Sequence, residues 1–208
     1  MNLIFSIFYN YLVLPFLYSA LRIGGLFNKK IRTGIVGRKR VYEELILSAT
    51  AINKKKKLIW FHSSSLGEFE QAKPIIERLK QEKNVNVLIT FFSPSGYENS
   101  KKYPYADLIS YIPFDTKSNA EKFIAITNPT LAVIMRYDVW PNMISSLKAK
   151  NIPIYLVDAT LRSNSPRQYP LIKSFHKILF GNLTRILTVS ESDEIEFKSF
   201  GFDDKKVS

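Results

Sequence analysis

A glutamate follows a serine-rich turn at the start of a predicted helix. The stretch FHSSSLGEFEQAKPIIERL, residues 61–79, places three serines and a glycine between an apolar run and a helical pattern, and Glu68 opens the helix. A carboxylate at this position can act as a general base that takes a proton from an incoming hydroxyl. It can equally complement the helix dipole, and Ser65 followed by Glu68 matches a capping box. Both roles fit the spacing.

Four further loops follow predicted strands and carry polar side chains. They read SPSG at 93–96, PFDT at 113–116, RYDVWPN at 136–142 and DATLRSNSPRQY at 158–169. None contains GxGxxG or a Walker sequence, so a standard dinucleotide or P-loop nucleotide site is not predicted. Residues 63–68 and 93–96 both offer Ser and Gly just before a helix, where free backbone N–H groups attract phosphate or carboxylate.

Short apolar runs alternate with helical patterns from residue 57 onward. The predicted strands are 57–62, 85–92, 108–112, 130–135, 152–157 and 185–189. The predicted helices are 68–82, 95–102, 117–127, 140–150, 168–180 and 191–200. This alternation predicts an α/β fold with a doubly wound, mostly parallel sheet, in which ligands bind beyond the carboxyl ends of the strands.

The N-terminal segment is apolar and aromatic. Residues 3–27 contain one charged side chain, Arg22, and their length is near the roughly 20 residues that span a bilayer. A spanning helix and a helix lying in one leaflet both fit, and a buried core helix is the alternative outside a membrane. A cleaved signal peptide fits less well, because no Lys or Arg precedes the apolar stretch.

A basic segment follows the apolar one. The chain has 208 residues and a net charge of +12, and residues 28–57 hold ten Lys or Arg and two Glu. An apolar segment followed directly by basic residues favours a membrane anchor with the rest of the chain on the cytoplasmic side. We expect an anchor helix over 1–28, a basic juxtamembrane segment over 29–56 and an α/β domain over 57–208.

The composition argues against several classes of site. The chain has no cysteine, so disulfides, cysteine zinc sites and thiol nucleophiles are excluded. His62 and His176 are far apart in sequence, so no metal site is predicted and each is expected to be structural. Nucleic-acid binding is disfavoured, because the charge is concentrated beside the apolar segment and no recognised RNA or DNA motif is present.

Five motifs in order resemble one enzyme family. WFHSSSLGEFEQAKPII, ITFFSPSGYE, YIPFD, DVWPN and IPIYLVDATLR resemble the N-terminal domain of 3-deoxy-D-manno-octulosonic acid (Kdo) transferases. The resemblance implies the N-terminal, Rossmann-like half of a two-domain GT-B glycosyltransferase. That half binds the anionic lipid A precursor, and Kdo passes to it with inversion in lipopolysaccharide assembly. The resemblance also implies the cytoplasmic face of the inner membrane and no cofactor.

The family motifs assign roles to residues of this chain. The glutamate taken as general base corresponds to Glu68. The expected acceptor-binding residues are Ser64, Ser65, Gly67, Ser93, Ser95, Gly96, Arg136, Asp138 and Arg162. The fourth loop departs from the usual E-x-E-L-W-P, because Arg136 replaces the first acid and Asp138 keeps the second. Arg162 is displaced from the usual arginine position, and contact with a lipid phosphate and a solvated side chain both fit.

The family sequence would continue beyond residue 208 into a second domain that binds CMP-Kdo. The chain by itself is therefore expected to be an acceptor-binding half that is inactive without a donor domain. The alternative is a non-catalytic, membrane-associated lipid-binding module, which uses the same anchor and loops but does not use Glu68 as a base.

Overall fold

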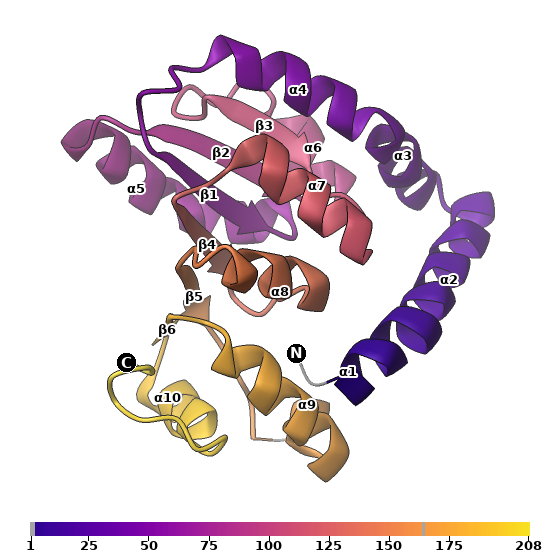
Figure 1. The fold of residues 1–208 in the computed structure, drawn as a ribbon, viewed down its shortest axis with the longest axis vertical. Helices are drawn as coiled ribbons and strands as arrows, with labels where there is room; N and C mark the ends of the chain where they lie inside the picture. Colours follow the sequence, from indigo (N-terminus) through magenta and orange to yellow (C-terminus); the bar gives the residue numbers. More distant parts are fainter. Residues whose placement is uncertain (1–2, 164) are drawn as a thin grey trace.

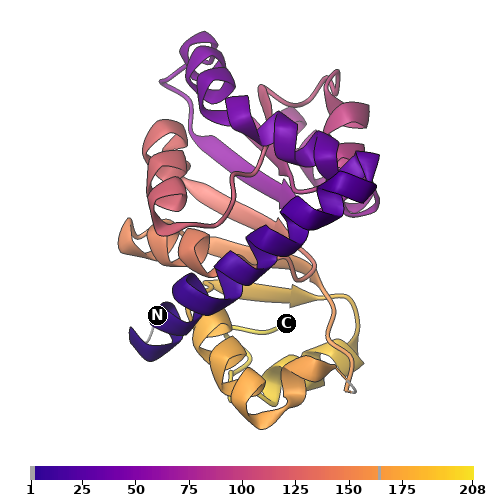
Figure 2. The same cartoon turned by 90° about the vertical axis from the view of Figure 1, so that its right-hand side faces the viewer.

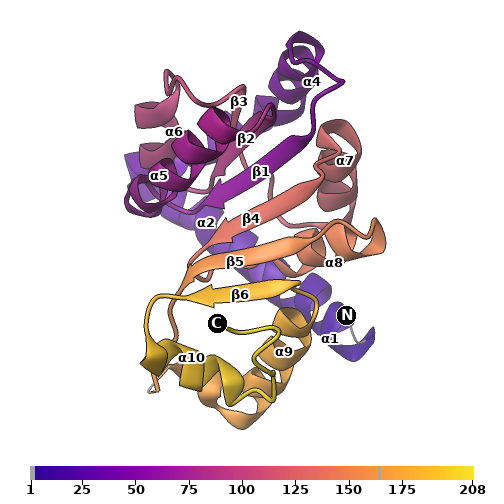
Figure 3. The same cartoon turned by 90° about the vertical axis from the view of Figure 1, so that its left-hand side faces the viewer.

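Six parallel strands form one sheet in the order β3-β2-β1-β4-β5-β6. The computed structural model describes residues 3–163 and 165–208 of the chain. The strands are β1 (Leu58–Ser63), β2 (Asn86–Phe91), β3 (Leu108–Tyr111), β4 (Leu131–Met135), β5 (Ile154–Ala159) and β6 (Arg185–Thr188) (Figures 1 and 3). The order reverses between β1 and β4, so this is a doubly wound sheet with its switch point there. The predicted fold class is confirmed.

Helices connect the strands as the alternation predicts. They are α5 (Leu66–Glu82), α6 (Pro94–Ser100), α7 (Lys117–Thr127), α8 (Pro141–Ala149), α9 (Pro170–Gly181) and α10 (Glu191–Lys198). The N-terminal helices are α1 (Leu3–Phe8), the π-helical turn η1 (Tyr9–Val13), α2 (Leu14–Phe27), α3 (Lys29–Gly37) and α4 (Val41–Ala51).

The core has two layers, one on each face of the sheet. Every residue of β1 and β2 is buried, as expected for strands covered on both sides. Phe69, Ala72 and Ile76 of α5 pack on one face. Helices α4, α7 and α8 contribute buried side chains to the cluster on the other face. Because successive side chains of a strand point to opposite faces, Trp60 and Phe61 belong to different clusters.

The N-terminal apolar run crosses the outside of the domain (Figure 2). Polar and aromatic contacts attach it: the Tyr9 hydroxyl donates to Asp115 at 2.9 Å, and the Tyr18 ring packs edge-on against Phe114 at 5.4 Å. The opposite side of the helix stays exposed, with Phe16 77% and Phe27 86% accessible. Among the described residues, Leu3–Phe27 is the one helical run that is long and apolar enough to cross a membrane by its length and composition.

The basic segment folds onto the domain. Val41 and Leu45 of α4 are buried in the core, so the core includes side chains upstream of residue 57. Arg38 is also buried, and its guanidinium donates to the carbonyl oxygens of Gly34, Ile112 and Phe92. These bonds fix the corner between α3 and α4 to the loops after β2 and β3.

Candidate functional site

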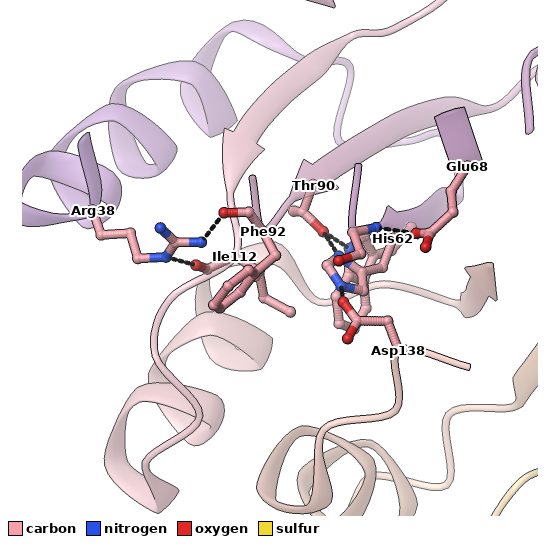
Figure 4. A network of polar contacts seen from close by, with 9 residues as sticks. Arg38, His62, Glu68, Thr90, Phe92, Ile112 and Asp138 are labelled. Carbon is pink, nitrogen blue, oxygen red and sulfur yellow. Dashed lines mark hydrogen bonds and ion pairs between the residues drawn. The ribbon is translucent and has the colours of Figure 1, made fainter. Parts of the chain in front are cut away.

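Loops from three neighbouring strands meet at the carboxyl edge of the sheet. The loop after β1 carries Ser64, the loop after β2 carries Ser93, and the loop after β4 carries Asp138. The Ser93 N–H donates to the Ser64 carbonyl at 2.8 Å, which joins the first two loops. Figure 4 shows Glu68 and Asp138 beside His62 at the switch point. This is where an open α/β sheet binds its ligand.

Glu68 lies in the first turn of α5 with its carboxylate bent back onto the preceding loop. The N–H groups of Ser64 and Ser65 both bond to this carboxylate. The Ser65 hydroxyl makes no capping bond to the helix. Half of the predicted capping box is therefore present. The Glu68 carboxylate accepts the Ser65 N–H, whereas the Ser65 hydroxyl accepts no N–H of the helix.

Glu68 is 7% exposed, and its surroundings favour the protonated form. Burial is the largest cause and raises the pKa of Glu68 above its ordinary value, and the charge of Asp138 raises the pKa further. The Ser64 N–H and His62 act in the opposite direction without reversing the shift. A carboxylate whose pKa is raised in this way binds a proton more strongly, which suits a general base.

His62 is buried at the end of β1 and links this strand to the loop after β4. Its Nε2 lies 2.8 Å from the Asp138 Oδ2, and its Nδ1 lies 2.9 Å from the Thr90 hydroxyl. The Trp60 indole N–H donates to the same hydroxyl at 2.8 Å. Since the indole can only donate, the Thr90 hydroxyl accepts from it and can donate its own hydrogen bond to Nδ1. The Nε2 of His62 then carries the hydrogen and donates to Asp138. This assignment gives a partner to the Trp60 N–H, the Thr90 hydroxyl and both ring nitrogens of His62.

Sequence reasoning missed the pair of His62 and Asp138. His62 was expected to be structural, whereas it bonds directly to a predicted acceptor-binding residue. The two residues are 76 positions apart, and only the adjacency of β1 and β4 brings them together. A polar residue at the end of one central strand and an acid in the loop after another form the sequence signal that could have predicted this pair. His176 bonds to the Ile172 carbonyl of its own helix.

The serines of the second loop organise the start of α6. The Ser93 hydroxyl lies 2.9 Å from the Ser95 hydroxyl and accepts the Gly96 N–H. A side chain at Gly96 would come within 2.3 Å of Phe91, so packing against β2 requires glycine there independently of any ligand. Gly67 differs, because it is exposed and a Cβ there would meet no atom within 4 Å.

Arg136 pairs with an aspartate that the sequence did not single out. Its Nε lies 3.4 Å from the Asp158 Oδ2 across the ends of β4 and β5. Both residues adopt left-handed backbone conformations, with φ of 62° and 57°. Such residues are strained and concentrate at functional sites. Arg162 lies further along the β5 loop and is exposed, and among the described residues its side chain makes no hydrogen bond or ion pair.

No group of three potential metal ligands occurs within residues 3–163 and 165–208. The polar groups that the site presents are the buried Glu68 carboxylate and the serines of the loops after β1 and β2. A carboxylate with a raised pKa can take a proton from a hydroxyl that is bound beside it.

Sequence comparisons match the chain to a transferase family. The profile described as 3-Deoxy-D-manno-octulosonic-acid transferase (kdotransferase) matches residues 39–208. The chain is 27% identical over 153 residues to the 3-deoxy-D-manno-octulosonic acid transferase of Haemophilus influenzae, covering 72% of this chain and 36% of that protein. It is 30% identical over 147 residues to the enzyme of the same name from Aquifex aeolicus, covering 70% and 38%. The chain therefore spans little more than a third of the length of these relatives.

Structural comparisons find the same fold in other enzymes. A UDP-GlcNAc 2-epimerase from Neisseria meningitidis, solved with UDP-GlcNAc, matches with a TM-score of 0.53 and 15% identity, over 73% of this chain and 44% of that one. A putative UDP-N-acetylglucosamine 2-epimerase from Listeria monocytogenes matches with a TM-score of 0.54 and 12% identity, over 73% and 44%. At these identities the likeness shows the fold alone.

Proposed function

Because this chain belongs to the 3-deoxy-D-manno-octulosonic-acid transferase family, we propose that it is the acceptor-binding half of a Kdo transferase in which Glu68 is the general base. The observation that carries the proposal is the buried Glu68 carboxylate, with its raised pKa, at the switch point of the sheet. The CMP-Kdo donor is bound by a second domain across the cleft.

The proposed step transfers Kdo with inversion. An acceptor hydroxyl of the lipid A precursor attacks the anomeric carbon of Kdo while the bond from that carbon to the CMP phosphate breaks. The phosphate departs with the electron pair of the broken bond, and Glu68 receives the hydroxyl proton. CMP is already a good leaving group, so no acid from this half is needed. His62 and Thr90 hold Asp138 beside the hydroxyl, and the serines of the β1 and β2 loops bind its sugar.

The proposed acceptor is an anionic lipid, and the proposed location is the cytoplasmic face of the inner membrane. The N-terminal run supports this placement, because one side of it contacts the domain and the other exposes large apolar side chains. A helix held along the domain in this way suits one leaflet better than a full span. No cofactor and no nucleic acid take part.

The test is Kdo transfer from CMP-Kdo to a tetraacyl lipid A precursor in detergent. The chain is assayed alone and with the donor-binding domain of a related enzyme. Transfer is expected in the combined sample, and Glu68→Gln should lower it by about 10²–10⁴-fold while lipid binding persists. Glu70→Gln is the matched control, since Glu70 is exposed and pairs with Lys73.

The alternative is a membrane-associated lipid-binding module without catalysis. It gains support if neither sample turns over while the chain still binds the lipid. Equal transfer by wild type and Glu68→Gln would reject Glu68 as the base and leave the family assignment intact.

A further inference from the structure

A hollow of about 530 Å³ lies between the N-terminal helix and the domain. Its lining includes Leu14, Leu17, Tyr18, Leu21, Phe114 and Trp140. The first four recur at helical spacing on one face of α2, and the last two belong to the loops after β3 and β4. The volume is within the range of about 300–1,000 Å³ for small-molecule sites.

A second hollow of about 160 Å³ continues from the first. Leu21 and Phe114 line both, so the two are neighbours. The second is also lined by Ile31, Phe92 and Ser93. Together they form a groove, which we call the α2 groove, that runs from the start of α2 to the loop after β2.

The α2 groove ends on the loops of the candidate site. Ser93 lines its inner end, and the Ser93 N–H bonds to Ser64, which in turn donates its own N–H to Glu68. Trp140 lines its outer part and follows Asp138 by two residues. The inner end of the groove is therefore one backbone hydrogen bond away from the loop that holds Glu68.

The walls of the groove identify its occupant. One wall is a helix long and apolar enough for a membrane, and its far side exposes Phe16, Ile23 and Phe27. Pro15 and Tyr18 line the groove and are exposed, so the groove is open to the surface on the side of this helix. At the inner end Lys30 is exposed and has no ion-pair partner among the described residues, which suits an anionic headgroup.

We propose that the α2 groove binds one acyl chain of the acceptor lipid and guides its headgroup to the β1 loop. This proposal rests on the proposed function, because the acyl chain belongs to the same acceptor lipid. Leu14, Leu17 and Leu21 give the chain an apolar wall to pack against. An acceptor without chains could not use this wall.

Tryptophan fluorescence can report binding in the α2 groove. The two tryptophans of the protein are Trp60, which is 1% exposed in the core, and Trp140, which lines the groove. The full chain in non-ionic detergent is titrated with dibrominated stearic acid, whose bromines quench tryptophan at close range, and with unbrominated stearic acid as the blank. Saturable quenching is expected with the brominated acid, and most of it should disappear in Trp140→Phe.

A pair of matched variants locates the chain. Leu21→Phe enlarges a side chain inside the groove and should raise the half-saturating concentration about tenfold, equal to about 1.4 kcal/mol. Leu26→Phe makes the same change on the same helix at a side chain that is 72% exposed, and should leave that concentration within about twofold. Equal effects of the two variants, or quenching that survives Trp140→Phe, would overturn the groove.

The outcomes separate this proposal from the proposed function. Absence of saturable quenching, together with Glu68-dependent transfer, would reject the groove alone. Saturable quenching by wild type, together with transfer that does not depend on Glu68, would reject Glu68 as the general base and leave the α2 groove proposal intact.

Discussion

The hydroxyl of Thr90 serves two buried neighbours at once. It accepts from the Trp60 indole and bonds to His62, which holds Asp138. Thr90→Val keeps the shape but removes these partners, and leaving a buried donor unpaired costs about 1–3 kcal/mol. We expect the free energy of unfolding in urea to fall by that amount and the Trp60 indole N–H resonance to move.

Thr90→Ser is the control, because it keeps the hydroxyl and loses a methyl group. It should cost about 1 kcal/mol and leave the indole resonance in place. If the serine variant moves that resonance as far as the valine variant does, the hydroxyl does not organise the site.

The residues of the site differ in how far sequence could predict them. Glu68 follows a strand and opens a helix, so local pattern places it at the ligand edge. The link from His62 to Asp138 depends on β1 pairing with β4 rather than with β3, and strand order is not a local property. Thr90 looks like an ordinary strand residue, and Asp158 looks like an ordinary loop residue, until the neighbouring strands are known.

At the scale of elements, Asp115 joins the N-terminal helix to the domain. It accepts the Tyr9 hydroxyl and the N–H groups of Asn142 and Met143 at the start of α8. Burial raises the pKa of Asp115 from 3.8 to about 7. Between these values the folded protein therefore holds a proton that the unfolded chain has released.

Stability should consequently fall as the pH rises through this window. The contribution of Asp115 is fully present below about pH 4 and is lost by about pH 7, with a total of up to about 4 kcal/mol. Urea unfolding in detergent from pH 4 to 8 measures this slope. Asp115→Asn cannot titrate, so its curve should be flatter, and equal slopes would show that other groups cause the dependence.

Arg38 fixes the corner between α3 and α4. Its three carbonyl partners come from Gly34, Phe92 and Ile112, and its guanidinium also stacks on Phe92 at 4.5 Å. Lysine lacks the planar fork, so Arg38→Lys should leave buried carbonyls unpaired and cost at least about 2 kcal/mol in urea unfolding.

The exposed Arg40 provides the matched control two residues away, since its side chain is 74% exposed. Arg40→Lys should change the free energy of unfolding by less than about 0.5 kcal/mol. Similar effects at both positions would mean that the buried bonds of Arg38 do not hold the corner.

The elements of the α/β domain were predictable because each strand contains a short apolar run and these runs alternate with helical stretches. Helices α3 and α4 were missed because residues 29–56 were treated as one basic segment, although Val41–Ala51 contains no Lys or Arg. Arg38 looks like one more solvated charge in RKR, and only the backbone carbonyls around it reveal that it is buried.

At the scale of the whole molecule, the basic residues at the two ends of the basic segment form separate groups, with Arg38, Lys39 and Arg40 between them. Lys29, Lys30 and Arg32 follow the apolar run directly and are exposed. Lys54 to Lys57 precede β1 and therefore lie at the amino edge of the sheet, opposite the candidate site. In Figure 1, α4 carries the chain from the first group toward the second. The sequence places both groups in one segment, and the fold separates them.

This separation predicts which charges bind a membrane. Each basic side chain near an anionic surface contributes about 1 kcal/mol. Changing Lys29, Lys30 and Arg32 to Gln should therefore weaken binding to vesicles that contain phosphatidylglycerol by about 100-fold. The same triple change at Lys54, Lys55 and Lys56 should weaken it by less than about threefold, because charges beyond a Debye length of about 10 Å are screened.

Co-sedimentation with vesicles at two salt concentrations measures both variants against wild type. Added salt should weaken wild type and the Lys54–Lys56 variant alike, and should affect the Lys29–Arg32 variant least, since its binding relies on the exposed apolar face of α1 and α2. If the two triple variants lose equal affinity, the domain does not meet the membrane along α2. The carboxyl edge of the sheet would then not face the lipid, and an acceptor in the bilayer could not reach Glu68 in the proposed orientation.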